Sequence, residues 1–249
     1  MIYAIGDIHG HLELLLQAHS LIAEDMSEHG AKSAPVGHLG DLVDRGPDSK
    51  GVIEFLIDGR AAGRNWIVPR GNHDQLFLDF LNGGDGTDPH LKKGMTWHSR
   101  VMGGAATLSS YAGEKRVIER KSSYENRARK SVPDSHRDFL RRLPYWYDTE
   151  DVLFVHAGIR PGFPMDAQDE DDLMWIRNDF LFHTAAHPKL IIHGHTPVNE
   201  PTHYGNRINI DCGAGWGHSL VPVVWDQGVC YALTVEGRQQ VKAPNEYYQ

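Results

Sequence analysis

The sequence is poor in cysteine, lacks any long apolar run and has no excess of basic residues. Two cysteines, Cys212 and Cys230, are too few for a disulfide framework, and their apolar, strand-like surroundings indicate buried thiols in a reducing compartment. No apolar run approaches the roughly 20 residues that span a bilayer. The formal net charge of −8 argues against a general binder of nucleic acid or of membrane surfaces. An anionic ligand therefore needs a local positive site.

A cleavable leader is not expected either. The first motif that contains candidate catalytic or metal-ligating residues, GDIHG, begins at Gly6. Removal of an N-terminal apolar segment would therefore remove this motif as well. We therefore expect a cytoplasmic protein. The 249 residues show no composition shift and no internal repeat, which predicts a single domain over residues 1–249. Nothing in the sequence indicates an oligomeric state.

The first 81 residues alternate between apolar strands, polar loops and helical patterns. Strands are predicted over residues 1–5, 36–39 and 66–68, and each is followed by a segment with apolar residues at helical spacing, over residues 12–27, 49–57 and 76–81. Asp74 is a candidate cap for the third helix. Right-handed crossovers make such a pattern a parallel sheet, and ligands bind at the carboxyl ends of its strands. The acidic and histidine-bearing loops all fall at that edge.

Residues 82–143 form a predicted loop and helical cap. Residues 82–107 are glycine-rich and read as a long loop, while residues 115–142 hold ten Lys or Arg against four Asp or Glu. The basic stretch is interpreted either as a solvated helical cap or as an anion-docking surface. Further along, the pattern predicts a hairpin over residues 145–155, an acidic loop at 166–172, a helix over 173–182, a strand at 190–192 and an antiparallel finish from residue 207.

Five clusters along the chain carry metal-ligating and phosphate-binding residue types. They are GDIHG at residues 6–10, GDLVDRG at 40–46, GNHD at 71–74, HAG at 156–158 and HGHT at 193–196. Mixed Asp, Asn and His ligands suit manganese, iron or zinc. Two divalent ions can activate one water and clamp phosphoryl oxygens, and an arginine fork suits two of those oxygens. The clusters predict a phosphoesterase with two metal ions.

These motifs, in this order, resemble the PPP-type phosphoprotein phosphatases of the calcineurin-like metallophosphoesterases, in particular their bacterial branch. The resemblance spans Asp7 to His195. It implies an α/β fold with a central two-sheet β-sandwich flanked by helices (αββα), and attack by a hydroxide that bridges two metal ions, most often manganese.

The resemblance also implies a role for each matching residue. The expected metal ligands are Asp7, His9, Asp41, Asn72, His156 and His195, with Asp41 bridging both ions. His73 is the expected general acid, and Asp44 orients it and favours its protonated form. Arg45 is expected to grip the phosphate, and Arg177 matches a second phosphate arginine more loosely. Asn72 is expected to contact substrate as well as metal.

Two positions depart from the eukaryotic members of the family, Asp74 in place of glutamate and Ala157 in place of glycine. Bacterial symmetrical diadenosine tetraphosphate hydrolases share the Asn-His-Asp version, but they typically have alanine where this chain has Asp44. The main hypothesis is therefore a serine/threonine protein phosphatase, with dual specificity left open, acting on phosphoproteins or phosphopeptides. The alternative is a symmetrical dinucleoside tetraphosphate hydrolase, and a third hypothesis is a non-catalytic phosphate-binding module.

Overall fold

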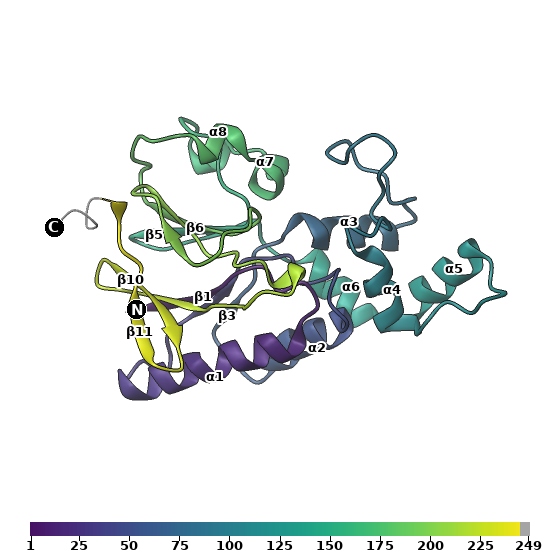
Figure 1. Ribbon diagram of the computed structural model, residues 1–249, viewed down its shortest axis with the longest axis horizontal. Coiled ribbons are helices and arrows are strands. Elements are labelled where there is room, and N and C mark those ends of the chain that lie inside the picture. The colour runs from purple at the N-terminus through teal and green to yellow at the C-terminus, as the bar shows by residue number, and fades with distance from the viewer. Residues whose placement is uncertain (245–249) are drawn as a thin grey trace.

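Two β-sheets form the centre of the computed structural model, which describes residues 1–244 (Figure 1). One sheet has the strand order β11-β10-β9-β1-β2-β3, and the other has the order β4-β5-β6-β8-β7. The strands are β1 (Ile2–Ile5), β2 (Val36–His38), β3 (Trp66–Ile67), β4 (Trp146–Asp148), β5 (Val152–Val155), β6 (Leu190–His193), β7 (Thr202–His203), β8 (Arg207–Asn209), β9 (Val223–Asp226), β10 (Val229–Thr234) and β11 (Gly237–Gln240). Residues 245–249, which the predicted single domain includes, lie outside the described part.

The first three strands are parallel, as the sequence predicts: Tyr3 pairs with Val36, and Val36 pairs with Trp66. They alternate with α1 (Leu12–Glu28), α2 (Ser49–Ala61) and α3 (Asn72–Leu81). Asp74 is not the residue that precedes α3 but the third residue within it. Its carboxylate accepts hydrogen bonds from the backbone N–H of Gly71 at 3.0 Å and of Leu42 at 2.9 Å. It therefore ties the start of α3 to the loop that follows β2.

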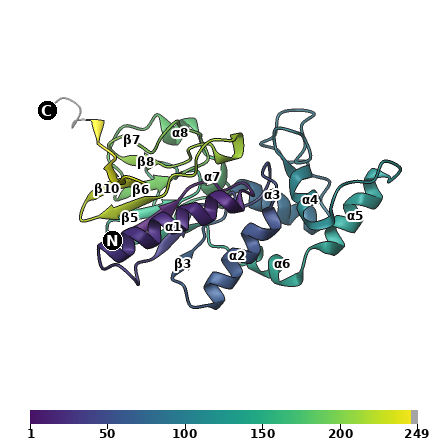
Figure 2. The same cartoon turned by 60° about the horizontal axis from the view of Figure 1, so that its bottom comes forward.

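The layers are helix, sheet, sheet, helix. Helices α1 and α2 lie against the outer face of the first sheet, and α7 (Glu170–Trp175) and α8 (Asn178–Leu181) lie over the second (Figures 1 and 2). Buried side chains from both sheets meet between them, among them Leu39, Phe154 and Ile192. This arrangement is the αββα fold expected from the sequence.

Four predicted segments differ in the structure. Helix α4 (Gly104–Ala112) begins inside the predicted loop 82–107, and α7 begins inside the predicted acidic loop because Asp169 caps it through the Asp171 N–H. The predicted helix 173–182 is broken between α7 and α8, where Arg177 has φ −131° and ψ −96°. Strand β8 runs parallel to β6 on one side and antiparallel to β7 on the other, so β9 to β11 alone form a purely antiparallel finish among the described residues.

The segment 82–143 extends to one side of the sheets and carries α4, α5 (Lys121–Ser131) and α6 (Asp134–Arg141) (Figure 1). Arginines of this basic stretch bond to their own chain: Arg129 donates to the carbonyls of Phe80 and Gly84, and Arg127 pairs with Glu119 at 2.8 Å. These contacts favour a structural cap over an anion-docking surface. Within residues 1–244, no helix is both long and apolar enough to cross a bilayer.

Candidate metal and phosphate site

The predicted site residues converge at the carboxyl ends of five strands. Asp7 and His9 follow β1, residues 41–45 follow β2, Asn72 and His73 begin α3 after β3, His156 follows β5 and His195 follows β6. These residues are buried except Arg45, which is half-buried, whereas the predicted site residue Arg177 is exposed. The structure thus brings together residues separated by up to 188 positions in the sequence.

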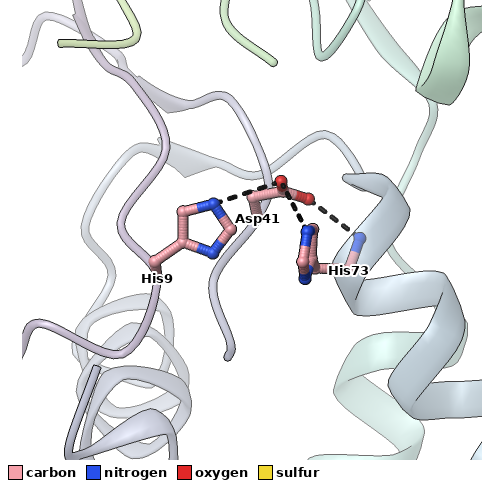
Figure 3. Close-up of side chains that lie close together, drawn as sticks. All are labelled: His9, Asp41 and His73. Carbon is pink, nitrogen blue, oxygen red and sulfur yellow. Dashed lines mark hydrogen bonds and ion pairs between the residues drawn. The ribbon is translucent and has the colours of Figure 1, made fainter. Parts of the chain in front are cut away.

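Asp41 lies at the centre of this cluster (Figure 3). His9 and His73 point towards its carboxylate from different segments, with His9 Nε2 at 3.4 Å and His73 Nε2 at 4.0 Å from Oδ2. Its other oxygen, Oδ1, lies 3.4 Å from His156 Nε2 and accepts the backbone N–H of His73 at 2.9 Å. Candidate ligand atoms form two groups, His9-Asp41-His73 and Asp41-His156-His195, each within 4.8 Å. Asp41 belongs to both groups, as a bridging ligand requires.

The histidine tautomers leave lone pairs directed into these groups. His9 Nδ1 donates to the carbonyl of Val43 at 2.9 Å, and His156 Nδ1 donates to that of Leu39 at 2.8 Å. Since a carbonyl only accepts, each ring carries its proton on Nδ1 and turns its Nε2 lone pair inward. Burial lowers the pKa of both histidines, which keeps the rings neutral. Neutral imidazoles with one fixed nitrogen are the form that binds metal ions.

The second group contains acceptors that face one another. Asn72 Oδ1 lies 2.9 Å from His156 Nε2 and 3.0 Å from His195 Nδ1, and His195 Nε2 is buried without a hydrogen-bond partner among the described residues. A lone pair on His156 Nε2 opposite the Asn72 oxygen is unfavourable unless a cation lies between them. The residues present therefore fit a divalent ion coordinated by Asp41, Asn72, His156 and His195.

Asp7 lies beside the two groups rather than within either one. Its carboxylate accepts the backbone N–H of His195 at 3.1 Å. Burial and the charges of Asp211 and Asp41 raise the pKa of Asp7 well above its usual range. Burial also raises the pKa of Asp211 to about 6. Three buried carboxylates repel one another, so a cation beside Asp7 would relieve that repulsion.

Asp44 and His73 form a buried pair, as the sequence predicts. His73 Nδ1 donates to Asp44 Oδ2 at 2.6 Å, and Trp97 Nε1 donates to the same oxygen at 2.7 Å. Thr107 donates to the other oxygen at 2.6 Å. Three donors hold the carboxylate in place, and its bond to Nδ1 fixes the orientation of the His73 ring.

Arg45 lies across the first group. Its guanidinium donates to His9 Nε2 at 2.6 Å and to His73 Nε2 at 3.0 Å, and it packs 4.5 Å from the ring centroid of Trp216. Arg177 is exposed at the other side, where its charge contributes to lowering the pKa of His156 and His195 after burial. The two arginines thus bracket the cluster.

The backbone at the site is strained. Six non-glycine residues among those described have a positive φ, and five of them are His9, Asp41, Asp44, Arg45 and His195. Such conformations are disfavoured for L-residues and concentrate at functional sites. The surrounding loops hold these side chains in place against that cost.

Sequence reasoning missed several residues of the site. Asp211 follows the end of β8, and its position after an apolar strand was a usable signal. Trp97 and Thr107 lie in a segment predicted to be a loop, and no local pattern distinguishes them. His193, the first residue of the HGHT motif, bonds Arg207 at 3.1 Å and packs on Phe180. It belongs to the core of the second sheet.

Comparison with known proteins supports the fold and the class of chemistry. The calcineurin-like phosphoesterase family model matches residues 1–221. Proteins named asymmetrical bis(5'-nucleosyl)-tetraphosphatase PrpE from Anoxybacillus flavithermus and Oceanobacillus iheyensis are 27% and 28% identical, covering 88% and 87% of this chain and 89% and 85% of their own. None of these names refers to a serine/threonine phosphatase, so the predicted protein phosphatase branch is not confirmed.

Solved structures share the architecture. A putative diadenosine tetraphosphatase aligns with a TM-score of 0.60 and 23% identity over 93% of this chain and 92% of its own. A cold-active protein-tyrosine phosphatase of a psychrophilic Shewanella aligns with a TM-score of 0.58 and 15% identity over 97% and 80%. Such identities carry the fold alone. Because the family model covers most of the sequence, the chain belongs to the calcineurin-like phosphoesterases, hydrolases of phosphoesters that use divalent metal ions.

Proposed function

We propose that this chain hydrolyses dinucleoside polyphosphates of the bis(5'-nucleosyl) tetraphosphate class. The observation that carries the proposal is the pair of arginines on either side of the buried cluster. Arg45 contacts His9 and His73, while Arg177 lines a pocket together with Trp175, whose ring lies 6.1 Å from that of His195. A chain of linked phosphates offers a separate anionic group to each arginine. The names of the relatives support the same substrate class.

The proposal assigns the cluster to two divalent ions, manganese by preference, with iron or zinc as alternatives. Asp7, His9 and Asp41 hold one ion, and Asp41, Asn72, His156 and His195 hold the other. The bound ions supply Lewis-acid polarisation of the phosphoryl oxygens and a nucleophile at neutral pH. Asn72 also contacts the substrate. One domain over residues 1–249 and a cytoplasmic location stay predictions of the sequence.

The proposal gives His73 the proton that the leaving oxygen takes up. Its Nδ1–H is held by Asp44 at 2.6 Å, so Nε2 is the atom that faces the cluster. Arg45 donates to that Nε2 at 3.0 Å, so its fork has to turn to the substrate phosphate before Nε2 can carry the proton that the leaving oxygen takes up. Arg45 then orients the phosphoryl group through two N–H groups, and His73 protonates the oxygen that departs.

A serine/threonine protein phosphatase is the second candidate, and the His73–Asp44 pair favours it. The alkoxide of serine or threonine is a poor leaving group and needs a strong general acid. A nucleotide leaves as a phosphate, which is far less basic. Asp44 accepts hydrogen bonds from His73, Trp97 and Thr107, and these bonds hold His73 in the orientation that a general acid needs.

A side-by-side turnover assay with Mn²⁺ separates the candidates. Diadenosine tetraphosphate and a panel of phosphoserine and phosphothreonine peptides are offered to the same preparation. We expect higher kcat/KM for the dinucleotide. One water added to the substrate yields ATP and AMP on asymmetrical cleavage or two ADP on symmetrical cleavage, and chromatography of the products decides between them. Preference for peptides would reverse the assignment in favour of the second candidate.

A further inference from the structure

A half-exposed tryptophan lies at the edge of the metal and phosphate site. Trp216 ends a short 3-10 helix (Ala214–Trp216) and is 51% exposed. A singly exposed apolar side chain is ordinary by itself, and what distinguishes this indole is its place beside the phosphate arginine. Arg45 covers one part of its ring, with the guanidinium carbon 4.5 Å from the ring centroid.

The backbone holds this tryptophan at the site. Gly213 and Gly217 flank the turn with φ of 80° and 87°, a conformation that favours glycine. A Cβ at Gly215 would meet His9 Cδ2 at 2.5 Å and Arg45 Cδ at 2.9 Å. The turn therefore rests directly on a predicted metal ligand and on the phosphate arginine. The position of the Trp216 ring is set by the site itself.

A second aromatic pair lies at the other end of the cluster. The Trp175 ring stacks on His90 with centroids 4.7 Å apart and planes 11° apart, and it meets the edge of His195 at 6.1 Å. Trp175 and His90 line a pocket of about 230 Å³ together with Arg177. His90 is held by Asp88 at 3.0 Å and by Asp171 at 2.9 Å.

The two aromatic groups are joined by a continuous series of contacts through the cluster. Trp216 packs on Arg45, Arg45 bonds His9, and His9 faces Asp41. From Asp41 the series continues through His156 and His195 to Trp175. An arginine and a tryptophan therefore lie at each end, with the acidic and histidine residues between them.

We propose that Trp216 stacks on one nucleobase of the substrate and that the Trp175–His90 pair receives the other. The inference rests on the proposed function, and it names the groups that distinguish a dinucleotide from bare polyphosphate. Base–aromatic stacking tolerates any base because every base has a π-face. Asp171 and Asp179 line the Trp175 pocket, where they pair with His90 and Arg160, and their remaining carboxylate lone pairs face the exocyclic amino groups of a base in this proposal. The two ends differ in exposure and in charge, so the two halves of a symmetrical substrate bind unequally.

The test compares Trp216→Ala and Trp216→Phe with the parent chain, all loaded with Mn²⁺. We expect Trp216→Ala to raise KM for diadenosine tetraphosphate roughly 5- to 100-fold, the range of one stacked base, with Trp216→Phe recovering most of the loss. Inhibition by inorganic tripolyphosphate, which has no base, should change by less than about 3-fold. An equal loss for tripolyphosphate would show that Trp216 only positions Arg45, which overturns the inference. Trp175→Ala in the same assays tests the other end.

Tyr204 offers a matched control. It is 43% exposed and carries Arg207 at 3.8 Å from its ring, but it lies in the turn between β7 and β8. Tyr204→Ala should leave KM for the dinucleotide unchanged. Calorimetry with a methylene-bridged dinucleotide reads binding without turnover. Binding that depends on Trp216 in a chain unable to hydrolyse the dinucleotide would overturn the proposed function and support base recognition. If Trp216→Ala and Trp175→Ala both turn over the dinucleotide as the parent chain does, base recognition is overturned and the proposed function stands.

Discussion

Replacing Asp44 by asparagine removes one charge from the site with little change of shape. Asp44 is fully buried and accepts from His73, Trp97 and Thr107. An asparagine oxygen in place of Oδ2 still accepts from His73 and Trp97. Its amide then faces the Thr107 hydroxyl, which can accept because it also lies 3.0 Å from the Ser49 hydroxyl. We therefore expect Asp44→Asn to fold and to keep its metal ions.

The magnitude follows from the lost charge. A hydrogen bond to a charged group contributes about 1.5–3 kcal/mol, compared with about 1 kcal/mol for a neutral one. If this difference of about 0.5–2 kcal/mol is lost where His73 gives its proton to the leaving group, turnover of substrates with poor leaving groups falls roughly 2- to 30-fold. Substrates whose leaving group needs no proton should keep nearly all of their turnover. Asp44→Ala differs, because the buried N–H groups of His73 and Trp97 lose their acceptor, and destabilisation of about 2–6 kcal/mol follows.

The assay measures kcat for an aryl phosphate and for an alkyl phosphate, alongside metal content by elemental analysis. The reasoning predicts a large fall for the alkyl phosphate, a small one for the aryl phosphate, and unchanged metal. Metal lost in proportion to turnover would mean that Asp44 is a ligand. An equal fall for both substrates would refute the role of His73 as the acid.

Three further predictions follow from other contacts. Asp41→Asn should lower the metal content towards zero, since one carboxylate serves both ligand groups, and a preparation that keeps both ions would contradict the bridging role. Trp97→Phe should lower kcat for alkyl phosphates about 3- to 10-fold, because it removes one hydrogen-bond donor to Asp44 while the His73–Asp44 contact is kept. An unchanged kcat would show that Trp97 does not support the general acid. Burial lowers the pKa of His19 to about 4, below the 6.5 of the unfolded chain. Below pH 6.5 the unfolded state then binds more protons than the folded state. The contribution of His19 to the free energy of unfolding is therefore fully present above pH 6.5 and falls by about 3 kcal/mol towards pH 4. Urea titrations of His19→Gln should show a shallower fall, and an identical one would exclude His19 as its source.

The sequence predicted the part of the fold that follows from local alternation. Three strands, each followed by a polar loop and a helix, leave little choice but a parallel sheet with its ligands at one edge. Asp41, Asn72 and His195 were accessible for that reason, because each lies in a short motif directly after an apolar strand. The hairpin before His156 was equally visible in the alternation of residues 145–155.

The features that the sequence did not predict depend on contacts between segments far apart in the chain. Trp97 and Thr107 reach Asp44 across more than 50 residues, and their own neighbourhood carries no periodic signal. The break at Arg177 separates α7 from α8 although the apolar spacing continues through it. Substrate preference was the least accessible property. Asp44 was used to argue for a protein phosphatase, but its contacts only orient His73. The choice of substrate depends instead on residues at the edge of the site.

The strained backbone at the site lowers the stability of the fold in order to position the catalytic side chains. Arg45 has φ +66°, which costs an L-residue about 1–2 kcal/mol relative to glycine. We expect Arg45→Gly to be more stable than Arg45→Ala by about 1 kcal/mol, although neither retains the guanidinium. The same trade applies at His9 and Asp41. A laboratory selection for heat resistance alone would therefore enrich glycine in these loops and erase activity, and any thermostabilised version has to gain its stability from the helices and sheets instead.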